Sequence, residues 1–293
     1  MRRALIPLAF FAQFSRPLTL KQIRRYGWGR EFSVDELKQM LKKTDTKQSG
    51  DFYFLDEYHV LEYMTRVKRA PKFWTKVKKY LWVFANVPFL KMAAVGNTLA
   101  YDNVNDNSDI DLFIVAKKNR VWTARAWLLA WLGILGVRVR SERKYMKFSL
   151  EFFVDEAALD LSRCAIANDY YLAFWLADLV PVWNRKYFDV LWKENQWLKS
   201  QLPVAYRSPN VRGEFIRPVK SSWFAWMVEQ ILKGKFGDRI EAWARRKQLR
   251  IIEKNKQKLG INPSVITDER VIKIHFNDKR AEVRDKIEEF LAG

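Results

Sequence analysis

Residues 95–115 read VGNTLAYDNVNDNSDIDLFIV, and this stretch decides the fold that we expect for the centre of the chain. A Gly-Asn turn at Gly96 and Asn97 ends one apolar segment, and an Asp-Ile-Asp pair opens the next. Because side chains alternate along a strand, Asp109 and Asp111 are predicted on one face, while Ile110 points into a core. Two carboxylates placed in this way suit a hard cation such as Mg²⁺, which commonly lies between carboxylates and the phosphates of a substrate.

The segments on either side of this stretch predict an α+β unit over residues 71–203. Apolar runs with strand character cover 89–95, 109–116 and 146–154. A helical pattern covers 121–136, and the pattern from 159 to 199 is mostly helical and rich in Trp and Tyr. At these spacings most of the aromatic side chains are expected in the core rather than in a base-stacking surface.

A third carboxylate, Glu151, lies within an apolar run that extends from Phe148 to Val154. Alternation turns Glu151 away from Leu150 and Phe152, so it can face the Asp pair across a sheet. It also fits an ordinary glutamate at a sheet edge, since one sequence does not reveal strand register. Asp155, just beyond the strand, is the substitute candidate.

The order of strand, Gly-Asn turn, loop, Asp-x-Asp strand and later carboxylate resembles the polymerase-beta-like nucleotidyltransferase superfamily over roughly residues 72–200. In that family a Gly-Ser turn, an Asp-x-Asp pair and a third acidic residue form the catalytic core. Here Gly96 matches the glycine, and Asn97 stands where serine is usual. Asp109 and Asp111 match the pair, and Glu151 is the candidate for the third position. The resemblance implies a nucleotidyltransferase fold.

The resemblance also implies an enzyme that moves a nucleoside monophosphate from a nucleoside triphosphate (NTP) to a hydroxyl group and releases pyrophosphate. The cofactor would be Mg²⁺ or Mn²⁺, bound by Asp109, Asp111 and Glu151. The acceptor is left open among a nucleic acid, a protein and a small molecule.

Four residues near the Asp pair are candidates for binding the nucleotide: Gly96, Asn97, Ser108 and Lys117. A glycine lets the backbone approach phosphate closely, and an asparagine donates an amide hydrogen bond. Ser108 either caps the turn or touches phosphate. Lys117 follows the second strand and either reaches phosphate or remains a solvated loop lysine.

Residues 1–70 have the outline of a winged-helix domain, with three short helical patterns followed by a strand pair around Phe52–Leu55. Thr19–Gln22 and Ser33–Glu36 each have the spacing of a capping box at a helix start. Lysines decorate the third helix, which in such domains enters a DNA groove. The fold also serves packing or protein contacts. The whole chain is similar to bacterial proteins that join a winged helix to a minimal nucleotidyltransferase domain, and Pro71 marks the expected joint.

Positive charge is concentrated in the two flanks of the chain. Residues 1–85 hold 18 Lys and Arg against 8 acidic residues, 86–203 hold 15 against 13, and 204–293 hold 20 against 12. The third region, 204–293, is predicted as a basic and mainly helical C-terminal region, with a loop over 203–218. Basic flanks beside a nearly neutral centre favour a polyanionic partner such as a nucleic acid, although solvated charged helices have the same composition.

Composition excludes several other kinds of site. A single cysteine, Cys164, rules out an intramolecular disulfide. The presence of only two histidines argues against a histidine-ligated zinc centre. The apolar N-terminal residues lack a cleavage pattern, so they are read as a first helix in a core. The apolar run 126–137 is shorter than the roughly 20 residues that a membrane-crossing helix needs. We therefore expect a cytoplasmic protein without a membrane partner.

A second class of function uses the same fold without catalysis. A degenerate nucleotidyltransferase unit can bind a nucleotide or a partner in a DNA-binding regulator or an antitoxin-like protein. The Asn97 replacement and the unproven role of Glu151 motivate this alternative.

Overall fold

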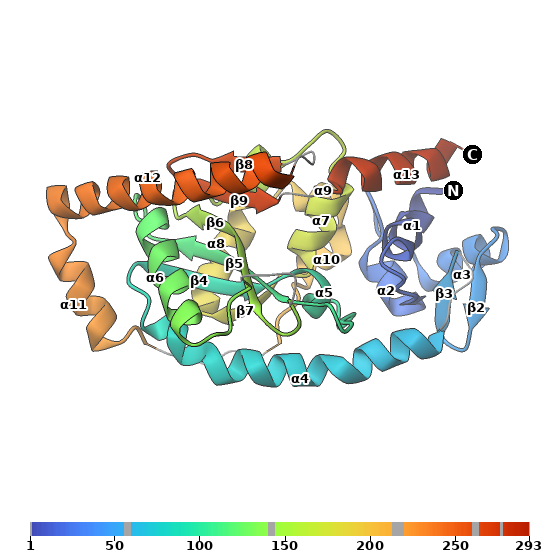
Figure 1. Cartoon of the computed structure of the whole chain (residues 1–293). Helices are drawn as coiled ribbons and strands as arrows, with labels where there is room; N and C mark the ends of the chain where they lie inside the picture. Colours follow the sequence, from blue (N-terminus) through green and yellow to red (C-terminus); the bar gives the residue numbers. More distant parts are fainter. Residues whose placement is uncertain are drawn as a thin grey trace.

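The computed structural model describes residues 2–55, 60–139, 144–212, 220–259, 264–275 and 278–292, and it is a mixed α and β protein with two sheets (Figure 1). The larger sheet has six strands in the order β7-β4-β5-β6-β9-β8. Strands β5 and β6 are parallel, and every other neighbouring pair is antiparallel. The strands are β4 (Leu90–Val95), β5 (Ile110–Ala116), β6 (Phe148–Asp155), β7 (Val180–Trp183), β8 (Ser264–Thr267) and β9 (Val271–His275).

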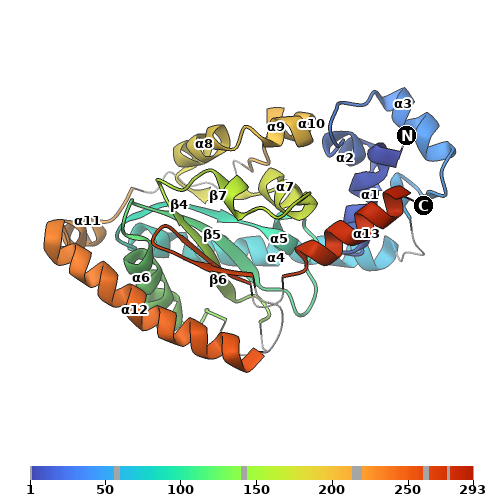
Figure 2. The ribbon, with the colours of Figure 1, turned by 90° about the horizontal axis from the view of Figure 1, so that it is seen from above.

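Helices cover both faces of this sheet, as Figure 2 shows from above. One face packs against α4 (Val60–Ala85), α6 (Val121–Ile134), α11 (Trp223–Ile231) and α12 (Gly234–Leu259). The other face packs against α7 (Tyr170–Ala177), α8 (Arg185–Glu194), α9 (Leu198–Gln201), α10 (Pro203–Arg207) and α13 (Arg280–Ala292). Short helical turns are η1 (Arg2–Leu5), α5 (Asn97–Ala100) and η2 (Leu161–Cys164). The sheet is therefore a central layer whose two faces are both buried.

The three strands and the helix predicted around the Asp pair are confirmed, with ends shifted by one or two residues. Strand β7 interrupts the stretch that was predicted to be mainly helical. Strands β8 and β9 lie in the C-terminal region and complete the sheet, so that region is less uniformly helical than predicted. Strand β9 was missed because Lys273 interrupts its apolar run, yet this lysine is buried and pairs with Asp278 (Nζ–Oδ2 3.4 Å).

The first 55 residues form a small unit of three helices and three strands. Its elements are α1 (Ile6–Ala12), β1 (Leu18–Thr19), α2 (Leu20–Arg25), α3 (Val34–Lys42), β2 (Lys47–Ser49) and β3 (Phe52–Phe54), with antiparallel strands in the order β1-β3-β2. Both predicted capping boxes are present. The Thr19 hydroxyl accepts from the Gln22 N–H, and the Gln22 side chain accepts from the Thr19 N–H. Ser33 and Glu36 make the same reciprocal pair.

Helix α4 runs unbroken through Pro71, so this proline does not break the helix, and a domain boundary there stays a prediction. Proline removes one helical N–H donor without forcing the chain to leave the helix when the surrounding packing holds it. Buried side chains on both sides of Pro71, among them Ala70 and Phe73, hold α4 against the core. Figure 1 shows α4 extending past both sheets, so the boundary predicted at residue 70 falls inside one continuous element.

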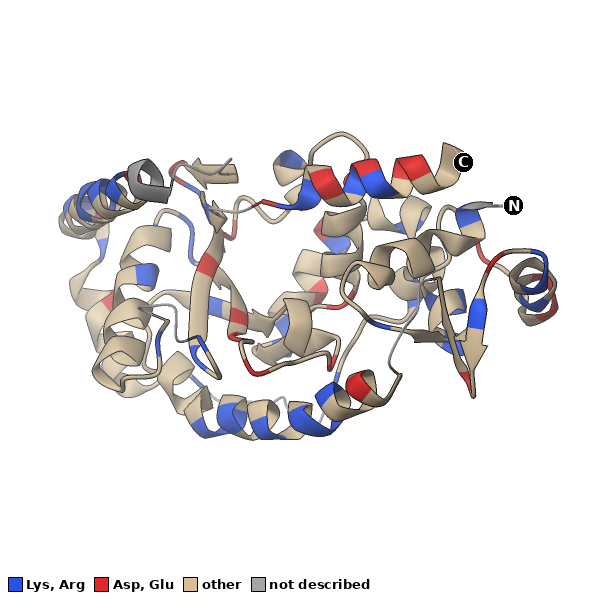
Figure 3. Cartoon of the chain, turned by 45° about the vertical axis from the view of Figure 1, so that its right-hand side comes forward, with Lys and Arg blue, Asp and Glu red and all other residues tan. Residues whose placement is uncertain are grey.

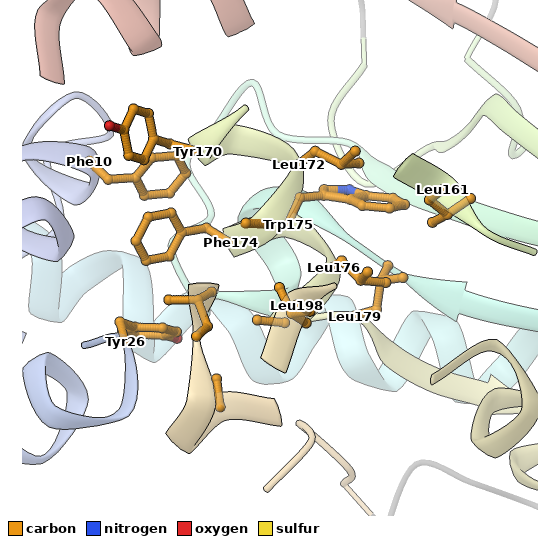
Figure 4. Packing of buried hydrophobic residues seen from close by; sticks show 14 of the residues in the cluster. Phe10, Tyr26, Leu161, Tyr170, Leu172, Phe174, Trp175, Leu176, Leu179 and Leu198 are labelled. Carbon is orange, nitrogen blue, oxygen red and sulfur yellow. The ribbon is translucent and has the colours of Figure 1, made fainter. Parts of the chain in front are cut away.

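The N-terminal unit and the large sheet share one hydrophobic core. Phe10 of α1 stacks on Phe174 of α7 with ring centroids 4.3 Å apart, and Figure 4 shows the two rings facing each other. The Tyr26 hydroxyl donates a buried hydrogen bond of 2.6 Å to Asp178. The N-terminal unit is thus packed onto the centre of the chain. Of the helices described, none is both long enough and apolar enough to cross a membrane.

Candidate functional site

The candidate site lies at the end of the large sheet where β4 stops and where β5 and β6 begin. The Gly96 N–H donates to the Asp111 carbonyl (3.0 Å), which ties the Gly-Asn turn to the start of β5. The Ile110 N–H donates to the Lys147 carbonyl (2.8 Å), which ties β5 to the entrance of β6. Backbone hydrogen bonds therefore hold the predicted turn beside the predicted Asp pair.

Gly96 is required by packing against α7. Its φ is −120°, an ordinary extended value, but a Cβ at this position would lie 2.8 Å from Nε1 of Trp175. Any larger residue would displace the indole ring. The close approach to phosphate that the sequence predicts for this glycine stays a prediction.

Asn97 has a backbone conformation that explains the replacement of serine. Its φ is +52°, in the left-handed region, where asparagine is several-fold enriched among non-glycine residues. The Asn97 side chain hydrogen-bonds to Asp111 and so acts to lower the pKa of that carboxyl. The Tyr171 hydroxyl in turn donates to Asn97 Oδ1 (3.2 Å). A line of hydrogen bonds from α7 thus orients Asp111.

The charged forms of Asp109 and Asp111 are disfavoured by their surroundings. Burial raises the pKa of Asp111 well above its usual range, and the negative charges of Asp109 and Glu151 raise it further. Burial also raises the pKa of Asp109, against the opposing effect of the Lys144 ammonium. The three candidate carboxylates are therefore within electrostatic range of one another.

Glu151 reaches this position through an irregularity in β6. Asp111 pairs with Ser149 but Phe113 pairs with Phe152, so β6 carries one extra residue between the two pairs. Strict alternation, predicted for this strand, fails here, and Leu150 and Phe152 pack into different hydrophobic clusters. Burial and then the charge of Asp109 raise the pKa of Glu151 to about 7.

The donor set of the site is suited to a hard divalent cation. As the side chains are placed, no three acidic, histidine or cysteine side chains among the described residues converge enough to hold a metal ion. Burial opposes the charged form of all three carboxyls, and repulsion between neighbouring carboxylates adds to this cost at Asp111 and Glu151. A cation bound among these oxygens would relieve it.

Three other candidates have different roles. Ser108 is buried in its own turn, where its hydroxyl accepts from the Asn105 N–H (2.9 Å) and donates to Asn105 Oδ1 (3.2 Å). Lys117 follows the opposite end of β5, six residues from Asp111, and at about 3.3 Å per residue the two are roughly 20 Å apart. Asp155 ends β6 on that same side. Ser108 therefore organises the turn, and Lys117 and Asp155 lie outside the site.

A pocket opens beside Asn97 on the face of the sheet that carries α7. Its volume of about 130 Å³ is bounded by aromatic side chains of α7 and β6, with Phe14 from the N-terminal unit on one side. Arg280 in its lining is already paired with both Asp169 (2.7 Å) and Asp278 (2.8 Å). An apolar cavity of ~150 Å³ accommodates one benzene ring, so this pocket is suited to a single planar ring.

The sequence did not reveal Tyr171, Trp175, Lys144 or Arg125 as neighbours of the carboxylates. The first two lie in a helix of almost entirely apolar residues, which reads as a core helix. Lys144 and Arg125 come into range only through the tertiary fold. No protein-family model, curated protein or solved structure matches this chain.

Proposed function

We propose that this protein is a metal-dependent nucleotidyltransferase that moves a nucleoside monophosphate from an NTP to a hydroxyl group and releases pyrophosphate. The observation that carries the proposal is the gathering of Asp109, Asp111 and Glu151 at one end of the sheet, beside a Gly-Asn turn. Acidic groups with strongly raised pKa values in a cleft are typical of functional sites. In a purely structural ion-pair network, Lys or Arg side chains would form salt bridges with these carboxylates.

Asp109, Asp111 and Glu151 are the residues that would hold Mg²⁺ or Mn²⁺. When bound there, the cation neutralises negative charge on the phosphates and on the developing transition state. Asn97 and Tyr171 fix the orientation of Asp111. The aromatic pocket beside Asn97 is the proposed position of the nucleotide base.

In the transfer, the acceptor hydroxyl oxygen forms a bond to the α-phosphorus. The bond from that phosphorus to the bridging oxygen of the β-phosphate breaks, and pyrophosphate leaves with the bonding electron pair. The hydroxyl proton passes to Glu151, the carboxylate that lies beside both the Asp pair and a second pocket.

The direct test incubates the purified protein with each α-labelled NTP and Mg²⁺ or Mn²⁺, with and without bulk RNA. Transfer of label to RNA, to the protein or to a small molecule is expected, and Asp111→Asn should abolish it. A complete lack of label transfer with folded protein under every condition would contradict the proposal.

We also propose that residues 1–55 form a winged helix that binds nucleic acid, which keeps the regulator alternative open. The order of three helices, the antiparallel strands and the exposed lysines in and directly after α3 support this: Lys38, Lys42 and Lys43. Lysines and arginines also line the outer face of α4 (Figure 3). Salt-dependent DNA binding that survives Asp109→Ala plus Asp111→Ala but is lost when the three lysines become Gln would show an independent binding function.

A further inference from the structure

A second pocket lies on the other side of the large sheet, with Glu151 in its wall. Its volume is about 280 Å³, and it is enclosed by β6, α6 and α12. Polar groups reach it from Ser149, Arg125, Arg138 and Gln248. The remaining lining is apolar and comes mainly from Leu129, Ile252 and Ile274. The pocket thus joins one candidate catalytic carboxylate to two arginines.

Arg125 is buried without a bonded anion. It is 9% exposed, and its terminal nitrogens donate to two neutral acceptors, Gln248 Oε1 (2.7 Å) and the Leu150 carbonyl (3.4 Å). Its Nε lies in the interior with no hydrogen-bond partner. Burying a guanidinium in this way is costly unless an anion compensates the charge.

Arg138 is a second guanidinium group in the wall of the same pocket. Burial and then the positive charge of Arg138 lower the pKa of Arg125 to about 10, which places the two guanidinium groups within electrostatic range of each other. Glu151 provides only partial compensation, and its own carboxyl is already raised to a pKa of about 7. Planar guanidinium groups match phosphate oxygens in geometry and charge.

We propose that this pocket is the acceptor site and that the acceptor carries a phosphate group bound by Arg125 and Arg138. The assignment of the occupant as acceptor rests on the proposed nucleotidyltransferase function. Glu151 then faces both the metal ligands and the acceptor, so a hydroxyl of a compound anchored through its phosphate is held beside the group that takes its proton. The volume suits a ligand of about mononucleotide size, near the lower end of the roughly 300–1,000 Å³ of ordinary ligand pockets.

The test is a calorimetric titration of the full chain with AMP, which has a phosphate and free hydroxyls, and with adenosine, which lacks the phosphate. AMP should bind at least tenfold more tightly than adenosine. Arg138→Gln should weaken AMP binding about tenfold and leave adenosine unchanged. Arg125→Lys keeps the charge but loses the planar fork, and it should weaken AMP binding to a smaller extent.

Arg246→Gln is the matched control, because Arg246 is an exposed arginine on α12, the helix that contributes Gln248 to the pocket. It should leave AMP binding unchanged. Equal AMP affinity in the wild type and in folded Arg138→Gln would overturn the proposal. An equal loss of AMP affinity in Arg246→Gln and Arg138→Gln would also overturn it, because AMP would then be attracted by the positive charge of the surface in general.

Label transfer separates failure of this inference from failure of the proposed function. If no NTP is ever consumed but AMP binding depends on Arg138, the phosphate site stands and the catalytic proposal fails. If label passes equally well to phosphorylated and unphosphorylated acceptors, and Arg138→Gln does not change this, the nucleotidyltransferase proposal is supported. The proposal of a phosphate-binding acceptor site is then contradicted.

Discussion

The two ends of strands β5 and β6 carry acidic residues in opposite circumstances. At the end where the strands stop, Asp155 is fully buried and accepts from the N–H groups of Asn119 (3.1 Å) and Ala157 (2.9 Å). Glu156 accepts from the Lys118 N–H (3.0 Å) and the Tyr187 hydroxyl (2.7 Å). Although burial acts to raise it, these hydrogen bonds bring the pKa of Glu156 below its usual range.

At the end where the strands begin, burial raises the pKa of Asp109, Asp111 and Glu151, and the charges of neighbouring carboxylates raise those of Asp111 and Glu151 further. Asp111 receives a hydrogen bond from Asn97, yet its pKa stays well above the usual range. The same strands therefore present carboxylates that stabilise the fold at one end and carboxylates that strain it at the other. The difference indicates which end is built for a ligand.

The largest expected effect is on activity at the strained end. Asp111→Asn keeps the size of the side chain but removes a charge that would bind the metal. Label transfer should therefore fall by more than about 100-fold, because even the loss of a group that only hydrogen-bonds to a metal ligand costs up to about that much activity. Thermal stability should stay equal or rise, because a repelling charge is removed. A marked loss of stability with retained transfer would reverse the distinction between the two ends.

At the other end, Asp155→Ala should destabilise the protein. It leaves two backbone N–H groups without their acceptor, and we expect a loss of about 2 kcal/mol in the free energy of unfolding. Urea denaturation measures this loss. Label transfer per folded molecule should stay close to the wild-type value, since Asp155 lies away from the site.

A smaller effect is expected from Tyr171→Phe, which removes the hydroxyl that donates to Asn97. Stability should fall by about 1 kcal/mol, the usual net value of one hydrogen bond. Activity should fall roughly tenfold through kcat, within the range for groups that orient a metal ligand. A change confined to KM for the NTP would instead indicate a direct contact with the nucleotide.

The smallest effect concerns the pH dependence of stability. The pKa of Glu156 is lower in the folded chain than in the unfolded one, so its contribution is complete above about pH 4.3 and is lost as the pH falls through the folded value. Glu156→Gln should therefore lower stability at pH 7 and flatten its decline below pH 4. Melting curves of both proteins between pH 3 and 7 measure the difference, and parallel curves would contradict this role.

Local patterns predicted much of this molecule because they depend on residues close in sequence. The two capping boxes, the Gly-Asn turn and the strand that begins at the Asp pair all belong to this class. The need for glycine at position 96 also has a structural reason, since a side chain there would collide with the indole of Trp175. No local sequence pattern connects these two residues.

The parts that the sequence did not predict depend on contacts between distant segments. One extra residue in β6 sets the position of Glu151, and a register shift of this kind leaves no mark in the apolar pattern. Strand β9 contains a lysine that is tolerated only because Asp278 lies beside it. The acceptor pocket brings α6 and α12 together from positions more than a hundred residues apart, with Arg125 and Gln248 in contact.

Phe14 gives the N-terminal unit a direct part in the candidate site. It lines the aromatic pocket and lies 6.0 Å from the ring of Tyr171, the residue that orients Asn97. A chain shortened to begin at α4 would have one wall of that pocket open to water. Any nucleic acid that shifts α1 on binding also alters the affinity of the pocket for its ligand. By thermodynamic reciprocity, the pocket ligand then changes the affinity for that nucleic acid by the same factor.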